Sequence, residues 1–503
     1  MMRGLHTPVR AIRRRVFKEV AQLGFKADAD TLLADMEAIP YAIVNEDSEK
    51  YRESVYRARA IVRERLRLAM GLSLRPENKP VHLTAGVEAS NISEKYYEPP
   101  LMQVIPSACE SCEENKYEVS NICKGCLAHP CQEVCPKDAI SMVNGRSYID
   151  QEKCIKCGKC KAACPYDAIS HNVRPCEQAC GVKAIGSDEQ GRASILEDKC
   201  VSCGMCMVSC PFGAISDKSQ IFQLSHALRD GDKIIAIVAP AYISQFGDDV
   251  TPGKFKTALQ VLGFSDVHEV AFGADVGAIS EAHHYAKEVA TSNLPFLLTS
   301  CCPSWSMMAK KFFPTMIDNI SQELTPMVAT ARKVKQEQPD AKVVFIGPCA
   351  SKKLEAMRRT VRSDVDFVLT FEELDAMFDA REIDPASFEE DGSLHDATAA
   401  GRGYAVAGGV AGAIEACLKE YYPDVPVHIE HAESLAECKK VLALAKAGKL
   451  NGCMIEGMAC PGGCMGGAGT NVPVAKSSKE LKKFLASCSK KLPPKGLVDI
   501  ELN

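Results

Sequence analysis

The stretch LPFLLTSCCPSW, residues 294–305, places two adjacent thiols, Cys301 and Cys302, directly after a short apolar run. Such a run is consistent with a buried strand. Adjacent cysteines rarely form a disulfide with each other. We therefore expect two different roles for Cys301 and Cys302.

Two later stretches supply three further thiols. The stretch FIGPCASKKLE, residues 345–355, contains one cysteine, and EGMACPGGCMGGAG, residues 456–469, contains two. When Cys301 is set aside, four thiols remain: Cys302, Cys349, Cys460 and Cys464. Four thiolates is the number that a cubane 4Fe-4S cluster requires. We predict that these three distant segments meet at one metal site.

Together the three stretches resemble the signature motifs of FeFe-hydrogenases, TSCCPxW, PCxxKxxE and ExMACxxGCxxGG, and the resemblance covers about residues 120–475. The active site of that family is the H-cluster, a 4Fe-4S cluster joined to a diiron unit that carries CO, cyanide and a bridging dithiolate amine. The resemblance implies the reversible oxidation of H2 and reduction of protons, with H2 and protons as substrates.

The resemblance also implies a role for each thiol. Cys302, Cys349 and Cys460 would ligate the cubane, and Cys464 would both ligate it and bridge to the diiron unit. Cys301 would be the thiol that passes protons to the amine. A thiol suits this relay because it has one exchangeable proton and a pKa that small shifts can move into the useful range.

Four other residues fall on family positions near the diiron unit. Lys352 would donate a hydrogen bond to a cyanide ligand, although it could also be a solvated surface lysine. Met458 would be a packing contact near the bridging ligand, and Ala239 and Pro240 would line the pocket.

Two positions depart from the commonest family pattern. Gly347 stands where many members have Met, and Met327 stands where Gln is frequent. Both positions lie where neighbouring groups touch the diiron ligands in the family. The chain therefore looks like a divergent subgroup, and its redox potential, catalytic bias and oxygen tolerance do not follow from the resemblance.

A proton route is implied by the resemblance. The family's pathway Glu and Ser fall on Glu281 and Ser321, and the next two positions, commonly Glu and Arg, are His284 and Glu288. On a helix, Glu281, His284 and Glu288 would share one face. A histidine there would titrate near neutrality. The alternative is that His284 and Glu288 only face solvent.

Sixteen cysteines between residues 109 and 210 form a second region. CIKCGKCKAACPYDAI, residues 154–169, returns as CVSCGMCMVSCPFGAI, residues 200–215, after 46 residues. Each copy is the CxxCxxCxxxCP run of two-cluster bacterial ferredoxins, in which the fourth cysteine ligates the other cluster. The exchange predicts two cubanes: Cys154, Cys157, Cys160 with Cys210, and Cys200, Cys203, Cys206 with Cys164.

The remaining eight cysteines contain a third ferredoxin-like copy and two shorter pairs. The same exchange predicts two further cubanes: Cys123, Cys126, Cys131 with Cys180, and Cys109, Cys112, Cys176 with Cys135. This arrangement resembles polyferredoxin subunits with four 4Fe-4S clusters. The alternative is a zinc knuckle made by two CxxC pairs, Cys109, Cys112, Cys123 and Cys126.

The expected domain order follows from these patterns. Residues 1–75 read as a helical extension, 76–108 as a linker, 109–220 as α+β ferredoxin-like iron-sulfur domains, and 230–503 as the α/β catalytic domain. In the last, short apolar runs alternate with helical stretches, which predicts parallel sheets with flanking helices around a buried metal site. Cysteines at the ends of three runs agree with sites that form beyond strand carboxyl ends.

Composition restricts the partners. The chain has 503 residues, 25 cysteines and a net charge of −5, and nothing in its charge balance suggests nucleic acid. Grouped cysteines fit metal thiolates in a reducing cytoplasm. No apolar run approaches the roughly 20 residues that cross a bilayer, so we expect a soluble cytoplasmic protein without membrane contact.

We expect two kinds of protein partner: a ferredoxin or flavodoxin-like electron carrier, and the maturation proteins that insert the diiron unit. The alternatives to an enzyme are a hydrogen-sensing regulatory protein with low turnover and a hydrogenase-like iron-sulfur cluster carrier. No sensory domain is visible, and a cluster carrier would not need Cys301, Lys352 and Cys464.

Overall fold

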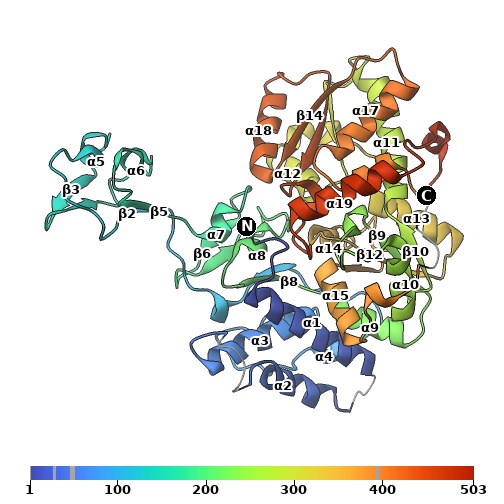
Figure 1. Cartoon of the computed structure of the whole chain (residues 1–503), viewed down its shortest axis with the longest axis horizontal. Coiled ribbons are helices and arrows are strands. Elements are labelled where there is room, and N and C mark those ends of the chain that lie inside the picture. Colours follow the sequence, from blue (N-terminus) through green and yellow to red (C-terminus); the bar gives the residue numbers. More distant parts are fainter. Residues whose placement is uncertain (1, 27–29, 46–50, 391–393, 395, 503) are drawn as a thin grey trace.

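The computed structural model describes residues 2–26, 30–45, 51–390, 394 and 396–502. It consists of a large body built on two parallel sheets and a small lobe, labelled β2, β3, β5, α5 and α6, that projects from it (Figure 1). No helix in these ranges is long and apolar enough to cross a membrane.

The larger sheet has four parallel strands in the order β10-β9-β12-β13. Their bounds are β9 Ile234–Val238, β10 Asp266–Glu269, β12 Lys342–Ile346 and β13 Phe367–Leu369. All five residues of β9 are buried, as expected for a central strand covered on both faces. The predicted parallel sheet is therefore present.

The smaller sheet has three parallel strands in the order β11-β15-β14. They are β11 Phe296–Leu298, β14 His428–Glu433 and β15 Cys453–Met458. Strand β14 was not predicted, because its residues HIEHAE lack an apolar pattern and remain mostly accessible at the sheet edge. The strand exists because its backbone pairs with all six residues of β15, from His428 opposite Cys453 to Glu433 opposite Met458.

Helices surround both sheets. Within this body they are α9 Ile221–Arg229, α10 Pro252–Leu262, α11 Ala271–His284, α12 Pro303–Phe312, α13 Pro326–Glu337, α14 Ser351–Glu355, α15 Phe371–Ala380, α16 Ala399–Gly403, α17 Gly409–Tyr421, α18 Leu435–Lys446 and α19 Val474–Ser487. Helix α11 packs against α13 and α17 and continues into a π-helical turn, Tyr285–Val289. The hydrogen bonds of this π-turn span one residue more than those of an α-helix, which changes the spacing between His284 and Glu288 but not between Glu281 and His284.

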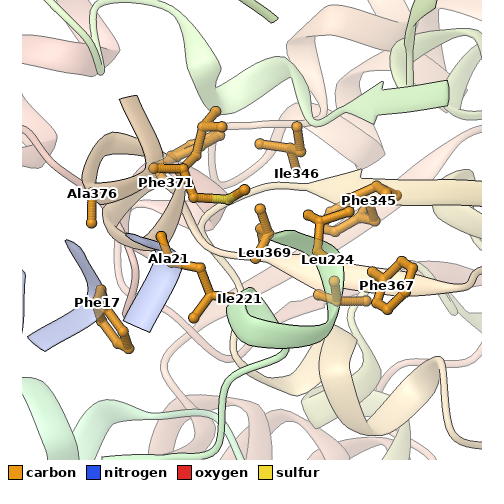
Figure 2. Packing of buried hydrophobic residues seen from close by; sticks show 14 of the residues in the cluster. Phe17, Ala21, Ile221, Leu224, Phe345, Ile346, Phe367, Leu369, Phe371 and Ala376 are labelled. Atoms are coloured by element: carbon orange, nitrogen blue, oxygen red, sulfur yellow. The ribbon is translucent and has the colours of Figure 1, made fainter. Parts of the chain in front are cut away.

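The amino-terminal helices pack on the larger sheet's side of the body. They are α1 Pro8–Lys26, α2 Leu32–Ile43, α3 Val55–Ala69 and the single turn α4 Val87–Ser90. Helix α1 contacts α9 and α15. Figure 2 shows Phe17 and Ala21 of α1 in the same apolar cluster as Ile221 of α9 and Ala376 of α15. This packing makes the amino-terminal segment continuous with the main core.

The cysteine-rich region forms two lobes, named here by chain order: the segment of the inner lobe is inserted within the segment of the outer lobe, and the inner lobe is the one that projects from the body (Figure 1). The outer lobe contains β1 Met102–Val104, α7 Pro175–Gln178, β6 Ile185–Ser187, β7 Ala193–Ile195, α8 Met205–Ser209 and β8 Ile215–Asp217. The inner lobe contains β2 Lys116–Val119, α5 Pro130–Glu133, β3 Ile140–Val143, β4 Arg146–Ile149, α6 Lys159–Ala163 and β5 Ile169–Asn172. Strand β1 pairs antiparallel with β8, and β2 pairs antiparallel with β5. The inner lobe is therefore an insertion between the first and last strands of the outer lobe.

Candidate metal centres

The three motifs meet at one cavity. All five of their thiols line it: Cys301, Cys302, Cys349, Cys460 and Cys464. The cavity and its opening enclose about 750 Å³ that no protein atom occupies. Strands β11, β12 and β15 deliver these segments from their carboxyl ends, where loops of parallel sheets commonly form sites.

The site thiols are deeply buried, and burial governs their protonation. Burial and the neighbouring Cys349 thiolate raise the pKa of Cys302, and burial and the same neighbour raise the pKa of Cys464. Thiolates crowded in an apolar hollow repel each other and lose solvation. A positively charged iron core at this place would reverse that preference, because metal binding favours deprotonated ligands. The donor set thus fits an iron-sulfur cluster.

Lys352 brings a buried positive charge to the same cavity. Its Nζ lies 2.6 Å from Glu355 Oε2, 3.4 Å from the Cys301 carbonyl oxygen and 3.5 Å from Thr325 Oγ1. Burial alone would lower the pKa of Lys352, but Glu355 first, and then Cys349 and Cys301, outweigh burial and raise it. Lys352 is therefore a charged donor at an otherwise apolar wall.

Trp305 holds the first motif in place. Its indole Nε1 donates a 3.0 Å hydrogen bond to the Thr299 carbonyl oxygen. A Cβ on Gly457 would lie 2.1 Å from the Trp305 ring, so only glycine allows the third motif to pass this close. Glu456 accepts hydrogen bonds from the amides of Gly408 and Ala411, so its carboxylate has a structural role.

The rest of the cavity is apolar. Among its lining residues are the predicted Ala239, Pro240 and Met458. The two departures from the family pattern also have a physical account. Met327 lines the cavity directly, and a Cβ on Gly347 would lie 2.6 Å from the Phe345 ring. The Phe345 ring thus fills the space beside Gly347.

A buried carboxyl lies behind Cys301. Burial raises the pKa of Glu281 to about 7, against hydrogen bonds from Ser321 and from the Ser300 amide that lower it. Glu281 in turn is among the groups that raise the pKa of Cys301, after burial and Cys302. The structure thus places Cys301, Glu281 and Ser321 next to one another.

A second, open hollow lies beyond Glu281. His284 and Glu288 line it, together with Glu323. Sequence reasoning missed Glu323, which lies on the hollow and also raises the pKa of the buried Glu281. Its amide donates a 3.3 Å hydrogen bond to Ser321 Oγ. The only signal in the sequence was its position two residues after Ser321.

The outer lobe gathers eight cysteines into two sets. Burial raises the pKa of Cys176 to about 12, and the neighbouring Cys210 and Cys109 contribute to this rise. After burial, Cys210 also raises the pKa of Cys112. Burial likewise raises the pKa of Cys203 to about 12, with Cys180 and Cys200 beside it, and Cys206 has the same neighbours. The sets are Cys109, Cys112, Cys176, Cys210 and Cys180, Cys200, Cys203, Cys206.

The inner lobe gathers the other eight. One hollow is lined by Cys135, Cys154, Cys157 and Cys160. Four cysteines of this lobe do not line that hollow, and they form the remaining set: Cys123, Cys126, Cys131 and Cys164. Cys131 and Cys164 both pack in the small apolar cluster of the lobe, together with Cys135, Cys154 and Cys160.

The predicted partners of the fourth cysteines were therefore wrong, although an exchange of fourth cysteines does occur. Cys210 joins Cys109, Cys112 and Cys176 and not the Cys154 set, and Cys164 lies in the inner lobe away from Cys200. The physical reason is that strand pairing closes each lobe on itself. The 46-residue repeat relates two copies that lie in different lobes.

The same division into lobes separates Cys109 and Cys112 from Cys123 and Cys126. These four thiols therefore do not form the zinc knuckle that was the alternative. In the described ranges, no three Cys, His, Asp or Glu side chains converge closely enough to hold a single metal ion. One of the four sets, Cys135, Cys154, Cys157 and Cys160, lines a hollow, as the ligands of a multi-iron cluster would.

One ferredoxin-like set adjoins the main cavity. Cys203 is among the groups that raise the pKa of Cys460, and Cys302 is among the groups that raise the pKa of Cys203. Ser304 Oγ donates a 3.0 Å hydrogen bond to the Val201 carbonyl oxygen across this junction. The sequence did not show which cysteine set would lie here.

Comparisons with known proteins agree with this arrangement. The domain described as "Iron only hydrogenase large subunit, C-terminal domain" matches residues 232–468. A "4Fe-4S binding domain" matches residues 147–170, and an "LdpA Fe-S cluster-binding domain" matches residues 170–221.

Two relatives extend over most of the chain. Iron hydrogenase 1 of Clostridium pasteurianum is 31% identical over 388 residues, which cover 66% of this chain and 67% of that protein. The periplasmic Fe hydrogenase large subunit of Nitratidesulfovibrio vulgaris is 32% identical over 380 residues, which cover 64% and 86%. A variant of the FeFe-hydrogenase HydA1 from Chlamydomonas reinhardtii aligns at 22% identity and a TM-score of 0.43, covering 52% of this chain and 87% of its own. At this TM-score the likeness carries no conclusion of its own.

The iron-only hydrogenase domain, the hydrogenase relatives and the 4Fe-4S domain together define the class of the protein, an iron-sulfur enzyme of hydrogen metabolism. The extent and identity of the two relatives make the assignment more specific. The chain belongs to the iron-only hydrogenase family.

Proposed function

We propose that this protein interconverts H2 with protons and electrons at an H-cluster held by Cys302, Cys349, Cys460 and Cys464. The observation that carries the proposal is the convergence of these thiols, Cys301 and Lys352 on one buried cavity. When bound, the H-cluster would supply the iron site at which H2 is formed or split.

The residues around the cavity would hold and orient that group. Cys464 would be the thiolate shared between the cubane and the diiron unit. Lys352, kept charged by Glu355, would donate a hydrogen bond to a ligand of the bound group. The apolar side chains of Met327, Phe345 and Met458 would exclude water from it.

Protons would travel by a route that ends at the open hollow. Cys301 would exchange a proton with the buried carboxyl of Glu281, whose pKa of about 7 lets it both donate and accept near neutrality. Ser321 would pass the proton on, and Glu323 would release it to the hollow. His284 and Glu288 would act only at the hollow's wall, in contact with solvent.

Electrons would travel through four 4Fe-4S clusters. The set that contains Cys203 would exchange electrons with the active site, since it adjoins Cys302 and Cys460. The set that contains Cys210 would follow in the outer lobe, and the two inner-lobe sets would be the most remote. A ferredoxin or flavodoxin-like carrier would be the external partner, and maturation proteins would insert the diiron unit.

The test is turnover by the matured full-length protein with a small redox dye. Reduced methyl viologen should drive H2 evolution, and H2 should reduce the oxidised dye. A protein that carries its full iron complement and shows neither reaction would contradict the proposal. Slow turnover in both directions with intact clusters would instead favour the hydrogen-sensing alternative.

A further inference from the structure

The inner lobe presents one cysteine set to solvent. All 25 cysteines are described, and Cys157 is the only exposed one among them. It lines the hollow of the set Cys135, Cys154, Cys157 and Cys160. The lobe itself projects away from the body (Figure 1), so a partner can approach it without meeting the catalytic sheets.

Basic side chains surround this hollow. Lys137, Ile155 and Lys159 line it together with the cysteines, and Lys156 is exposed directly beside Cys157. We call Lys137, Ile155, Lys156, Cys157 and Lys159 the basic face. Its Ile155 is 56% exposed and supplies an apolar centre.

The lysines of the basic face form no ion pair with any residue that the structure describes. The ion pairs of the described residues include Lys153 with Asp150, at 3.7 Å, but none with Lys137, Lys156 or Lys159. Glu133, Asp138 and Glu152 are exposed acids near these lysines along the chain, and none of the three forms an ion pair with them among the described residues. An exposed apolar residue ringed by unpaired charges of one sign is a feature of partner-binding surfaces.

We propose that the basic face docks an acidic ferredoxin, a small iron-sulfur protein that carries one electron. The proposal rests on the function proposed above and adds the surface and the charge of the partner. Carboxylates of the ferredoxin would face Lys137, Lys156 and Lys159, while Ile155 makes the central contact. Such charge complementarity mainly accelerates encounter and sets orientation, which suits a transient complex.

The electron balance is simple. Each reduced ferredoxin gives one electron to the cluster at Cys157 and leaves oxidised. Two such encounters supply the two electrons that combine with two protons to form one H2. In the reverse direction, each H2 reduces two ferredoxins.

The test uses the matured full-length protein and a reduced acidic ferredoxin with a single iron-sulfur cluster. The variant Lys156→Glu/Lys159→Glu reverses two charges on the basic face. Its ratio of ferredoxin-driven to viologen-driven H2 evolution should fall roughly tenfold at low salt, through a higher KM for ferredoxin. The fall should shrink as salt is added, because exposed charges are screened. The matched control Lys479→Glu/Lys482→Glu reverses two exposed lysines of α19 and should leave that ratio at the wild-type value.

Each outcome decides the proposal. An unchanged ratio in the basic-face variant overturns it, and so does an equal fall in the α19 control. It is also overturned if the charge reversal lowers flavodoxin-driven H2 evolution and leaves ferredoxin-driven H2 evolution unchanged. If the wild-type protein lacks viologen-driven turnover, the proposed function fails and docking is judged by calorimetric titration of ferredoxin. Binding that weakens roughly tenfold in the variant then supports the docking face, and equal binding overturns it. The milder variant Lys156→Gln/Lys159→Gln replaces the charge reversal if its clusters fail to assemble.

Discussion

Cys203 of the outer ferredoxin-like lobe and Cys460 of the third motif face each other across the junction between the two regions. Burial is the main cause of the raised pKa of Cys460, and Cys203 is among the neighbouring thiols that raise it further. The loop that carries Cys203 can come this close because its next residue is glycine. A Cβ on Gly204 would lie 2.6 Å from the Cβ of Ala468.

This contact predicts that Gly204→Ala slows electron transfer to the active site. The new methyl group would push the Cys203 loop away from the third motif, and the left-handed backbone at φ 76° adds about 1 kcal/mol of strain. Iron content should stay at the wild-type level while viologen-driven H2 evolution falls several-fold. Rapid-freeze electron paramagnetic resonance should show slower reduction of the active-site cubane.

Gly158→Ala is the matched control. Gly158 occupies the equivalent position of the inner lobe, with the same φ of 76°, but its added Cβ would meet the Tyr117 hydroxyl at 2.8 Å. That hydroxyl is the movable end of a side chain. If Gly158→Ala slows active-site reduction as much as Gly204→Ala, backbone strain and not the junction explains the effect.

Glu323→Gln tests the end of the proton route. The Glu323 charge raises the pKa of Glu281, which burial has already brought to about 7. For H2 evolution Glu281 must hold a proton, so the rate should fall as pH rises through about 7. Removing the Glu323 charge should lower the pKa of Glu281 and move this inflection to lower pH. Turnover at the optimum should also fall about tenfold or more.

The control for that prediction is Glu288→Gln. Glu288 lines the same hollow, but it is not among the groups that act on Glu281. Its substitution should leave the inflection in place. A pH profile of Glu323→Gln that superimposes on the wild-type profile would refute a role for Glu323.

Substitution of single cysteines tests the corrected pairing. Cys164→Ala should disturb the inner-lobe cluster of Cys123, Cys126 and Cys131, and Cys210→Ala should disturb the outer-lobe cluster of Cys109. Each variant should lose about four iron atoms per chain. Mössbauer and electron paramagnetic resonance spectra should show different clusters missing. Loss of the Cys200 cluster in Cys164→Ala would instead support the pairing first predicted from the repeat.

Arg13→Ala tests how α1 is held on the body. Arg13 Nη2 lies 2.7 Å from Glu372 Oε2, and both residues are buried. Removing one partner of a buried ion pair costs about 3–5 kcal/mol, because the other charge remains buried alone. Hydrogen exchange of α1 should accelerate strongly. Arg15→Ala, which removes an exposed contact with the Ala42 carbonyl, should change it little; equal exchange in both variants would exclude the ion pair as the anchor.

The sequence predicted those parts of the fold that rest on local pattern. Strand β9 appears as the apolar run IIAIV because both of its faces are covered. Strand β14 has no such run, since it lies at a sheet edge and is specified by its pairing with β15. The motif cysteines were found because their spacing is local.

The remainder of the site depends on contacts between distant segments. Cys210 and Cys109 are neighbours only because β1 and β8 close the outer lobe around an inserted inner lobe. Glu323 matters because it lies near Glu281 in space, and no spacing in the sequence records that. Gly347 is compatible with the cavity because the Phe345 ring fills the adjacent space.

Infrared spectroscopy of the matured protein tests the proposed H-cluster most directly. The wild-type protein should show CO and cyanide stretching bands. Cys464→Ala should lose these bands and retain the ferredoxin-like clusters of both lobes. Bands of full intensity in Cys464→Ala, or no such bands in a matured wild-type protein that carries all its iron-sulfur clusters, would contradict this proposal.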